Sequence, residues 1–297
     1  MRRSLVLILC LSLSPRAARA EDPSQRLERP RAPMRDLDLG EAAFTGVLSA
    51  SILAAALIPG GENDAPAWQG GNLFDDAVRD AFVLGGADER RAASLASDGL
   101  ALGLTAMPAL LDAVVMAWFV RGDPELMARL LLVNLQAHAF AQGLTSLVKR
   151  TVRRERPVAR GCREDADRRA NDPSCEGQSD PGAAPHSFFS GHTSLAFTSA
   201  SLICLQHTEL GLFGPAGDAA ACATGMAIAS TVGLLRILSD KHYATDVLLG
   251  AGVGILSGWL VPWLLHFDVA DPQLGIRATV APMIDEDRIG AQIFGTF

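Results

Sequence analysis

Residues Arg236–Asp246 read RILSDKHYATD, and they join two long apolar segments, 218–239 and 243–267. Both segments have the length and composition of helices. Within the second, the run 247–265 carries no charged side chain, which makes it the best candidate for a membrane span. The chain is therefore predicted to be all-α, a helical bundle embedded in a membrane. Two more helices are predicted upstream, over 125–152 and 190–207.

The same stretch places a histidine and a carboxylate four residues apart. On a helix, His242 and Asp246 would share one face. A carboxylate there can accept a hydrogen bond from one imidazole nitrogen and leave the other free to attack phosphorus. Arg236, near the end of the preceding helix, can hold two phosphate oxygens with its guanidinium. Taken alone, the spacing describes an ordinary surface His–Asp pair equally well.

A second stretch, Ser190-Gly191-His192, opens a predicted helix. Backbone N–H groups at a helix N-terminus attract anions, and a glycine lets an oxygen approach closely. Ser190 can cap the helix or donate to a phosphate, and His192 can protonate a leaving oxygen. The alternative is a capped helix with an exposed histidine.

A third stretch follows the helix that Asp123-Pro124 is expected to start, with Asp123 as N-cap and Pro124 in the first turn. Here Lys149 and Arg156 can turn toward one anion. Alone, this stretch is better explained as a basic flank beside a membrane helix. Together the three stretches supply three cations, two histidines and one carboxylate. That set is what phosphoryl transfer through a covalent intermediate needs when no metal is used.

The amino-acid composition and net charge exclude one class of function and favour another. The chain has 297 residues, of which 49% are hydrophobic and 20% charged, and its formal net charge is −7. A nucleic-acid-binding protein would show a basic excess or stripe, so no nucleic-acid partner is expected. The high apolar content instead suits a membrane protein.

The N-terminus resembles an export signal. Arg2 and Arg3 precede the apolar run 5–13, and Ala18-Arg19-Ala20 before Glu21 is a small-x-small cleavage pattern. An uncleaved anchor is the alternative. The chain is divided into a signal peptide or anchor (1–20), a disordered linker (21–39), N-terminal helices (40–98), a helical core (99–267) and a C-terminal tail (268–297).

Two segments outside the three stretches carry weaker patterns. Residues 72–98 are predicted to form an amphipathic helix on a surface, with Phe74, Val78 and Phe82 on its apolar face. The tail, from Ile276 onward, alternates loosely and predicts a short β-hairpin.

The cysteines and four further histidines lie outside the three stretches. Cys162 and Cys175 lie in a polar loop predicted over 158–187, and in an oxidising compartment they are expected to form a disulfide worth roughly 3 kcal/mol. Two free thiols are the alternative. Cys204 and Cys222 are interpreted as plain core residues. The remaining histidines lack such a carboxylate partner and are interpreted as structural or solvated: His138, His186, His207 and His266. His186 is nevertheless close enough in sequence to the second stretch to line the pocket.

The predicted membrane crossings conflict with the predicted disulfide. If the signal is cleaved and segments 42–58, 100–120 and 126–147 all cross the membrane, the basic stretch and the loop cysteines face the cytoplasm. A disulfide there would be unusual. Either the N-terminal run is not translocated and 42–58 is the first crossing, or the helices form a soluble periplasmic bundle.

The three stretches together resemble the type 2 phosphatidic acid phosphatase and vanadium haloperoxidase superfamily over about residues 100–267. That family shows Lys, six residues and Arg-Pro; then Pro-Ser-Gly-His; then Ser-Arg, five residues, His, three residues and Asp. The first pattern matches fully. Phe189 replaces the proline of the second, and Leu235 replaces the serine of the third.

The resemblance implies roles for the matched residues. His242 would be the nucleophile that forms a phosphohistidine, Asp246 would orient it, and His192 would be the general acid. No metal or other cofactor is implied. The implied phosphate-binding residues are Lys149, Arg156, Ser190, Gly191 and Arg236.

The sequence thus predicts a metal-independent phosphatase acting on a lipid phosphate or lipid pyrophosphate. Its expected place is the inner membrane of a bacterial-type cell envelope, with a periplasmic active site. A soluble periplasmic acid phosphatase or phosphotransferase is the alternative. A vanadate-dependent haloperoxidase and a non-catalytic membrane scaffold are further alternatives. Nothing in the sequence indicates the oligomeric state.

Overall fold

The computed structural model describes residue 34 and residues 39–57, 66–176, 186–267, 269–271, 276–285 and 288–296. The expected signal peptide lies outside the described residues, as does nearly all of the expected linker.

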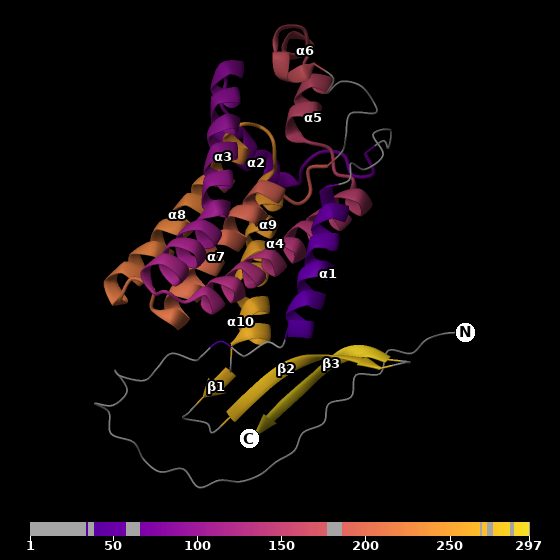
Figure 1. Ribbon diagram of the computed structural model, residues 1–297. Coiled ribbons are helices and arrows are strands. Elements are labelled where there is room, and N and C mark those ends of the chain that lie inside the picture. Colours follow the sequence, from indigo (N-terminus) through magenta and orange to yellow (C-terminus); the bar gives the residue numbers. More distant parts are fainter. Residues whose placement is uncertain are drawn as a thin grey trace.

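Long helical segments that alternate in direction form the body of the described molecule (Figure 1). They lie side by side as a bundle, with α7 in contact with α3, α4, α8 and α9. In chain order they are α1 (Leu39–Leu57), α3 (Ala87–Met107) with the π-helix η2 (Pro108–Val120), α4 (Pro124–Val152), α7 (Gly191–Leu210), α8 (Pro215–Leu238), and α9 (Ala244–Ile255) with the π-helix η4 (Leu256–Leu260) and α10 (Val261–His266).

Local sequence explains where several of these helices begin and end. Asp123 caps α4, because its side chain accepts a hydrogen bond from Leu126 N at 2.8 Å, and Pro124 occupies the first turn as expected. Ser190 caps α7 through the backbone N–H of Thr193. The end of α4 is set by Arg153, whose backbone is left-handed with φ 47°.

Glycines hold α9 against α7. A Cβ atom at Gly250 would lie 2.7 Å from the carbonyl oxygen of Ser190, and one at Gly254 would lie 2.6 Å from that of Ser194. One turn further, a Cβ atom at Gly258 would overlap the carbonyl of Thr198. Larger side chains would push the two helices apart, so this spacing of glycines brings the starts of α7 and α9 together.

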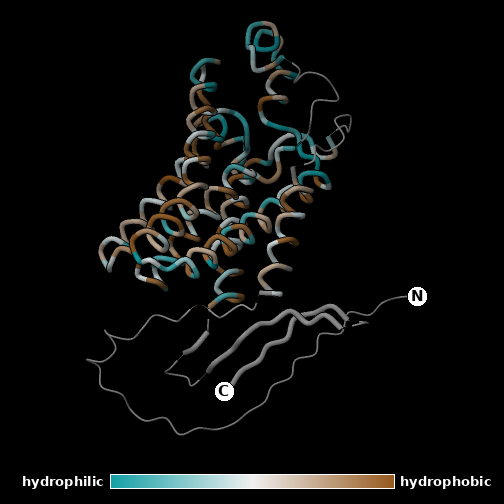
Figure 2. The backbone as a smooth tube through the Cα atoms, in the orientation of Figure 1, coloured by the Kyte–Doolittle hydropathy of each residue, from teal (hydrophilic) through white to brown (hydrophobic). Residues whose placement is uncertain are grey.

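Three described segments are long and apolar enough to cross a membrane: Ala87–Val120, Pro215–Leu238 and Ala244–His266. Hydrophobic backbone segments fill the bundle, whereas hydrophilic ones concentrate toward the end that carries α5 (Pro157–Glu164) and α6 (Ala166–Asn171) (Figure 2). The bundle therefore has the polarity expected of a membrane-embedded body with one polar end.

The amphipathic segment 72–98 differs from its prediction. It is divided into α2 (Leu73–Phe82) and the start of α3, because residues 83–86 include Gly85 and Gly86 and do not continue the helix. On α2 Leu73 is 90% exposed whereas Asp75 is fully buried. Asp75 is buried because it pairs with Arg154 of the bundle.

The predicted polar loop 158–187 is partly helical. Pro157 starts α5, the side chain of Asp165 caps α6, and that of Asp172 caps the 3₁₀ turn η3 (Pro173–Cys175). These caps explain why a polar segment forms short helices.

The described residues contain two disulfides. Cys162 and Cys175 are bonded with their Cα atoms 5.5 Å apart, which ties α5 to η3. Cys204 and Cys222 are also bonded, joining α7 to α8. The interpretation of this second pair as plain core residues was therefore wrong. Their separation of 18 residues gave no sign that two helices would bring them together.

The described helical part, residues 39–57, 66–176 and 186–267, contains no strand. Beyond it the backbone forms β1 (Val269–Asp271), β2 (Ile276–Asp285) and β3 (Arg288–Thr296), paired antiparallel in the order β1-β2-β3. The side chains of this tail are outside the description, and the expected hairpin stays a prediction.

Candidate active site

The three sequence stretches meet at one end of the bundle. The backbone N–H of Ser190 donates to the carbonyl of Asp246 at 3.0 Å, and that of His242 donates to the carbonyl of Arg236 at 3.2 Å. A Cβ atom at Gly191 would lie 3.4 Å from Nζ of Lys149. All three stretches are thus within contact of one another, although up to 97 positions separate Lys149 from Asp246.

His242 and Asp246 form the buried centre of this site. His242 is only 3% exposed, and its Nδ1 lies 3.6 Å from Oδ2 of Asp246. That carboxylate is held by other donors, since Oδ2 also accepts hydrogen bonds from Ser187 Oγ at 2.5 Å and from Tyr243 N at 2.9 Å. The His–Asp distance exceeds that of a hydrogen bond, and catalytic contacts are often this long before a substrate binds.

The environment keeps His242 neutral. Burial lowers the pKa of its imidazole to about 3, against the opposing effect of Asp246, and the cations Lys149 and Arg156 lower it further. A neutral imidazole has a lone pair available for attack on phosphorus. Within the described chain, His242 Nε2 has no hydrogen-bond partner.

Two cations at this site are unpaired. Within the part of the chain that the structure describes, the side chains of Lys149 and Arg156 have no hydrogen-bond or ion-pair partner, and Nε of Arg156 is buried. Burial, with Arg156 and Arg236 nearby, lowers the pKa of Lys149 to about 8. Like charges held together out of water are costly, so this arrangement favours a bound anion.

The third cation, Arg236, is held by α3. Its Nη1 donates to Oδ1 of Asp98 at 2.7 Å and to Oγ of Ser97 at 2.9 Å. The same Asp98 oxygen lies 3.0 Å from Nε2 of His192. Asp98 therefore joins the phosphate-binding arginine to the histidine expected to act as general acid.

Asp98 was not predicted as a site residue. It lies at the end of the amphipathic segment 72–98, with no motif around it. Its role depends on α3 packing beside α7 and α8, which sequence spacing does not reveal. Burial and the neighbouring Arg236 lower the pKa of His192 to about 4, although Asp98 opposes that shift.

Arg154 was also missed, because it was interpreted as one member of a basic run. It is fully buried, and its Nη1 donates to Oδ1 of Asp246 at 2.7 Å. Its Nη2 donates to Oδ2 of Asp75 at 2.6 Å. An arginine thus stands directly behind the carboxylate expected to orient His242.

The other histidines are bonded within the bundle. His207 was expected to lack a carboxylate partner, and that expectation was wrong: its Nδ1 lies 2.8 Å from Asp218 and its Nε2 3.2 Å from Asp112. His138 contacts Asn134 O at 2.7 Å and Ser199 Oγ at 3.0 Å, and His266 contacts Gln136. None of these three belongs to the site.

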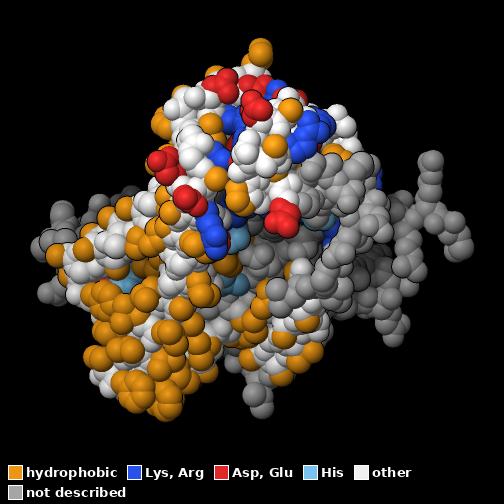
Figure 3. All heavy atoms as spheres, turned by 90° about the horizontal axis from the view of Figure 1, so that it is seen from above, with side chains coloured by type: hydrophobic (Ala, Val, Ile, Leu, Met, Phe, Trp, Pro, Cys, Tyr) orange, Lys and Arg blue, Asp and Glu red, His pale blue; other side chains and the backbone are white. Residues whose placement is uncertain are grey.

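A charged cap adjoins the site. Asp240, two residues before His242, accepts hydrogen bonds from Arg79 of α2 at 2.7 Å and from Arg168 of α6 at 2.8 Å. Seen from this end, charged side chains gather on one side, hydrophobic ones cover the opposite flank, and histidine side chains are visible between them (Figure 3). The Cys162–Cys175 disulfide stabilises this cap.

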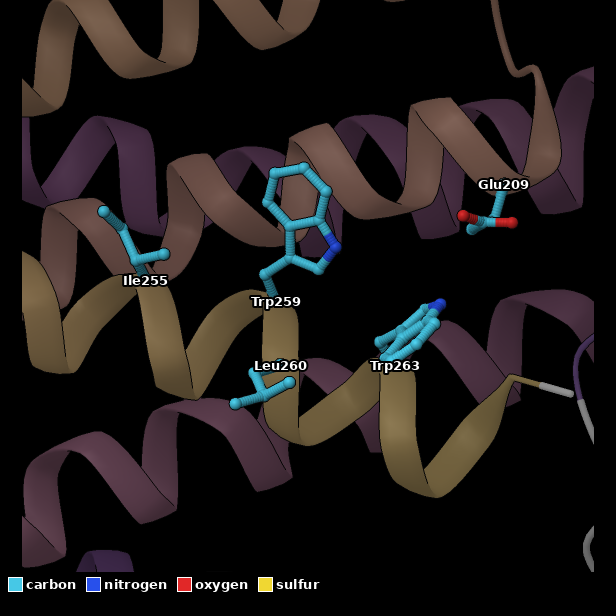
Figure 4. Close-up of a pocket in the computed structure, with 5 residues that line it drawn as sticks. All are labelled: Glu209, Ile255, Trp259, Leu260 and Trp263. Atoms are coloured by element: carbon cyan, nitrogen blue, oxygen red, sulfur yellow. The ribbon is translucent and has the colours of Figure 1, made fainter. Parts of the chain in front are cut away.

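A separate pocket of about 460 Å³ lies at the lower part of the bundle, lined by Glu209 of α7 and by apolar residues of α9, η4 and α10 (Figure 4). The apolar residues are Ile255, Trp259, Leu260 and Trp263. No residue of the candidate active site lines it. Among the described residues, no group of three or more His, Cys, Asp or Glu is placed to hold a metal ion.

Comparison with known proteins identifies a family for part of the chain. Residues 130–269 match the PAP2 superfamily. Over this segment the chain is similar to members of that superfamily. The resemblance inferred from the three stretches is thereby confirmed, and the segment contains every residue expected to bind or transfer phosphate.

Two similar proteins give the context of the PAP2 segment. A lipid A 1-phosphatase of Porphyromonas gingivalis is 42% identical over 91 residues, which are 31% of this chain and 19% of that protein. This chain thus matches about a fifth of that relative's length. The solved transmembrane PAP2-type phosphatidylglycerolphosphate phosphatase from Bacillus subtilis is 20% identical, with a TM-score of 0.44, over 74% of this chain and 93% of that one.

Proposed function

We propose that this PAP2 protein is a phosphatase that hydrolyses a lipid phosphate or lipid pyrophosphate through a phosphohistidine at His242. The observation that carries the proposal is the pair of unpartnered cations, Lys149 and Arg156, beside a neutral buried histidine. Such a site stabilises the charge on a transferring phosphoryl group without reorganisation. The match to the PAP2 superfamily supports it.

In the first step, Nε2 of His242 attacks phosphorus and forms the P–N bond while the bond from phosphorus to the leaving oxygen breaks. His192 gives its proton to that oxygen, so the leaving group departs as the lipid alcohol from a lipid phosphate, or as the protonated lipid phosphate from a lipid pyrophosphate. Asp246 holds Nδ1–H and stabilises the positive charge that develops on the ring. Lys149, Arg156 and Arg236 bind the phosphoryl oxygens, together with Ser190 and the backbone at Gly191.

In the second step, water attacks the phosphohistidine. His192, now neutral, accepts the proton of the water, and the P–N bond breaks to release phosphate. This returns His242 to its neutral form and His192 to its protonated form. An alcohol in place of water would give transfer instead of hydrolysis.

A lipid is favoured over a soluble ester by the surface next to the site. On α2, which is joined to the site through Asp75, the apolar side chains of Leu73, Phe74 and Phe82 are exposed. A short helix with an outward apolar face and buried polar contacts suits the membrane interface. The name of the Porphyromonas relative, a lipid A 1-phosphatase, points to the same substrate class.

A periplasmic orientation of the site is part of the proposal. The Cys162–Cys175 disulfide lies in the cap beside the site, and disulfides persist in oxidising compartments. With α1 as the first crossing, its start and the end of α10 would face the cytoplasm. A membrane-impermeant maleimide should then label Asp167→Cys, in the cap, but not Glu125→Cys, at the other end, in intact cells. The reverse pattern would refute this orientation.

The function is tested by phosphate release from purified protein in lipid nanodiscs with a chelator present. Suitable substrates are phosphatidic acid, an isoprenyl pyrophosphate, lipid A 1-phosphate and p-nitrophenyl phosphate. We expect release from at least one lipid, and its loss in His242→Ala. Release from the soluble ester alone would replace the proposal with a soluble-phosphate activity. Release that persists in His242→Ala would overturn the mechanism.

A further inference from the structure

We propose that Asp75 on α2, acting through Arg154, is a positioning residue for Asp246 and thereby for the nucleophile His242. Asp75 lies outside the PAP2 segment 130–269. The catalytic consequence rests on the proposed function, whereas the contacts that suggest it do not. The N-terminal α2 would then be part of the catalytic apparatus and not only a helix at its edge.

Arg154 is the centre of this arrangement. Its Nη1 reaches Asp246 at 2.7 Å and Thr245 Oγ1 at 2.8 Å, and its Nε donates to the carbonyl of Gly70 at 3.2 Å. The guanidinium also lies 4.0 Å from the ring of Trp68 and 4.1 Å from that of Tyr243. Contacts with both rings and four polar groups fix this side chain in one orientation.

Asp75 joins Arg154 to the first turn of α9. Oδ2 of Asp75 accepts from Arg154 Nη2 at 2.6 Å and from Thr245 Oγ1 at 3.0 Å, while Oδ1 accepts from Thr245 N at 2.8 Å. A capping box with Asn72 holds the carboxylate at the start of α2. Asp75, on α2, therefore caps the start of α9 at Thr245, the residue before Asp246.

Charge explains why two carboxylates share one arginine. If Arg154 paired with Asp246 alone, it would neutralise the carboxylate whose negative charge must stabilise an imidazolium at His242. Asp75 takes one of the two Nη groups, so the buried group Asp75–Arg154–Asp246 keeps a formal net charge of about −1. The arginine can thus fix the position of Asp246 without cancelling its effect on His242.

The first test is Asp75→Asn, with Asp76→Asn as the matched control. Asp76 is the next residue of α2, but its ion pair is with Arg160 at the surface. Loss of a partner that orients a reacting group typically costs about 10- to 100-fold in activity. We expect Asp75→Asn to lower kcat by that factor with KM within about twofold, because the phosphate-binding cations are untouched. Asp76→Asn should match wild type.

A double variant separates positioning from folding. If Asp75 acts through Asp246, adding Asp75→Asn to Asp246→Asn should cause little further loss of kcat. A merely structural role would reduce activity by the same factor in both backgrounds, and that result would overturn the proposal. Asp75→Glu, which keeps the charge, should recover part of the activity and also serves if Asp75→Asn does not fold.

Anion binding gives a readout that does not depend on turnover. Orthovanadate can accept a bond from His242 as a phosphoryl group would, whereas sulfate needs only the cations. By calorimetry, Asp75→Asn should weaken orthovanadate binding by about tenfold and leave sulfate binding unchanged. This pattern without lipid turnover in wild type would retain the positioning role and reject the proposed function. Equal effects on both anions would reject the positioning role.

Discussion

Two buried histidine–aspartate groups lie in this bundle, and they differ in whether both imidazole nitrogens have a partner. At the site, His242 has one carboxylate beside Nδ1, at 3.6 Å, and no partner on Nε2 among the described residues. His207 lies in the last turns of α7, far from the end of that helix that carries His192. It has a carboxylate at each nitrogen, Asp218 at 2.8 Å and Asp112 at 3.2 Å. Both rings are almost fully buried.

The comparison shows that a His–Asp contact by itself does not indicate catalysis. His207 has used both nitrogens to connect α7, α8 and η2, so it has no lone pair for chemistry. His242 is held on one side only, and the unpaired cations Lys149 and Arg156 are close enough to affect its protonation. A free nitrogen beside unpaired charge distinguishes the reactive group from the structural one.

The largest expected effect separates the two histidines directly. His242→Ala should reduce kcat by about a thousandfold or more, because the nucleophile is lost, while the protein stays folded. His207→Ala should lower the melting temperature but leave kcat per folded molecule within about twofold. Turnover and thermal melting in detergent measure both. A fully active His242→Ala, or a folded but inactive His207→Ala, would break the distinction.

The general acid should give the next largest effect. His192→Ala is expected to lower kcat by about 10²- to 10⁴-fold for a lipid substrate. The pKa of His192 is about 4 in the empty site, and a bound phosphate dianion must raise it because it favours the imidazolium. The alkaline limb of kcat should therefore lie at higher pH than that of kcat/KM. Coincident limbs that persist in His192→Ala would exclude this residue as the acid.

A smaller effect is expected on stability at the structural pair. Asp218→Asn keeps the shape but removes the charge beside His207, and it also weakens the bond from Phe213 N at 2.9 Å. Loss of such a buried contact should cost about 1–3 kcal/mol. A lowered melting temperature with unchanged kcat would fit. Altered kcat with unchanged stability would mean that this end of the bundle contributes to the chemistry.

The smallest effect concerns the unpaired cations. Lys149 has a pKa of about 8 in the empty site, so its charge is present below that pH and is lost above it. Sulfate affinity should weaken above pH 8 by at most about tenfold per pH unit, since one proton is involved. Lys149→Arg keeps its charge, so its affinity should stay flat to pH 9 in calorimetry. A parallel decline in both proteins would assign the pH dependence to another group.

Much of this fold could be read from local patterns. The helix expected over 125–152 is observed at 124–152, and that over 243–267 at 244–266. Capping by Asp123 and Ser190 also follows from short-range rules. The segment 72–98 was predicted as one surface helix, and burial of Asp75 within it could not be predicted, because that burial depends on Arg154, 79 positions away.

The site residues divide in the same way, into those that local patterns predict and those that depend on distant contacts. Most of the expected site residues could be selected from the sequence, because their spacing along the chain fits a known pattern: Lys149, Arg156, Ser190, His192, Arg236, His242 and Asp246. Asp75, Asp98 and Arg154 could not, since each acts through a distant partner: Asp75 through Arg154, 79 positions away, Asp98 through Arg236, 138 away, and Arg154 through Asp246, 92 away. An acidic residue in an amphipathic segment and an arginine in a basic run look like solvent-exposed charges.

The helical class, the PAP2 pattern and the groups suited to bind and transfer phosphate follow from composition and local spacing, and so could be inferred from the amino-acid sequence. Which of the charged side chains are paired and which have no partner depends on how the helices pack. Glycines on α9 allow it to approach α7 closely, and α2 and α3 bring Asp75 and Asp98 to the site. Pairing in a buried environment depends on distances of a few ångströms between helices, and a linear sequence does not specify those distances.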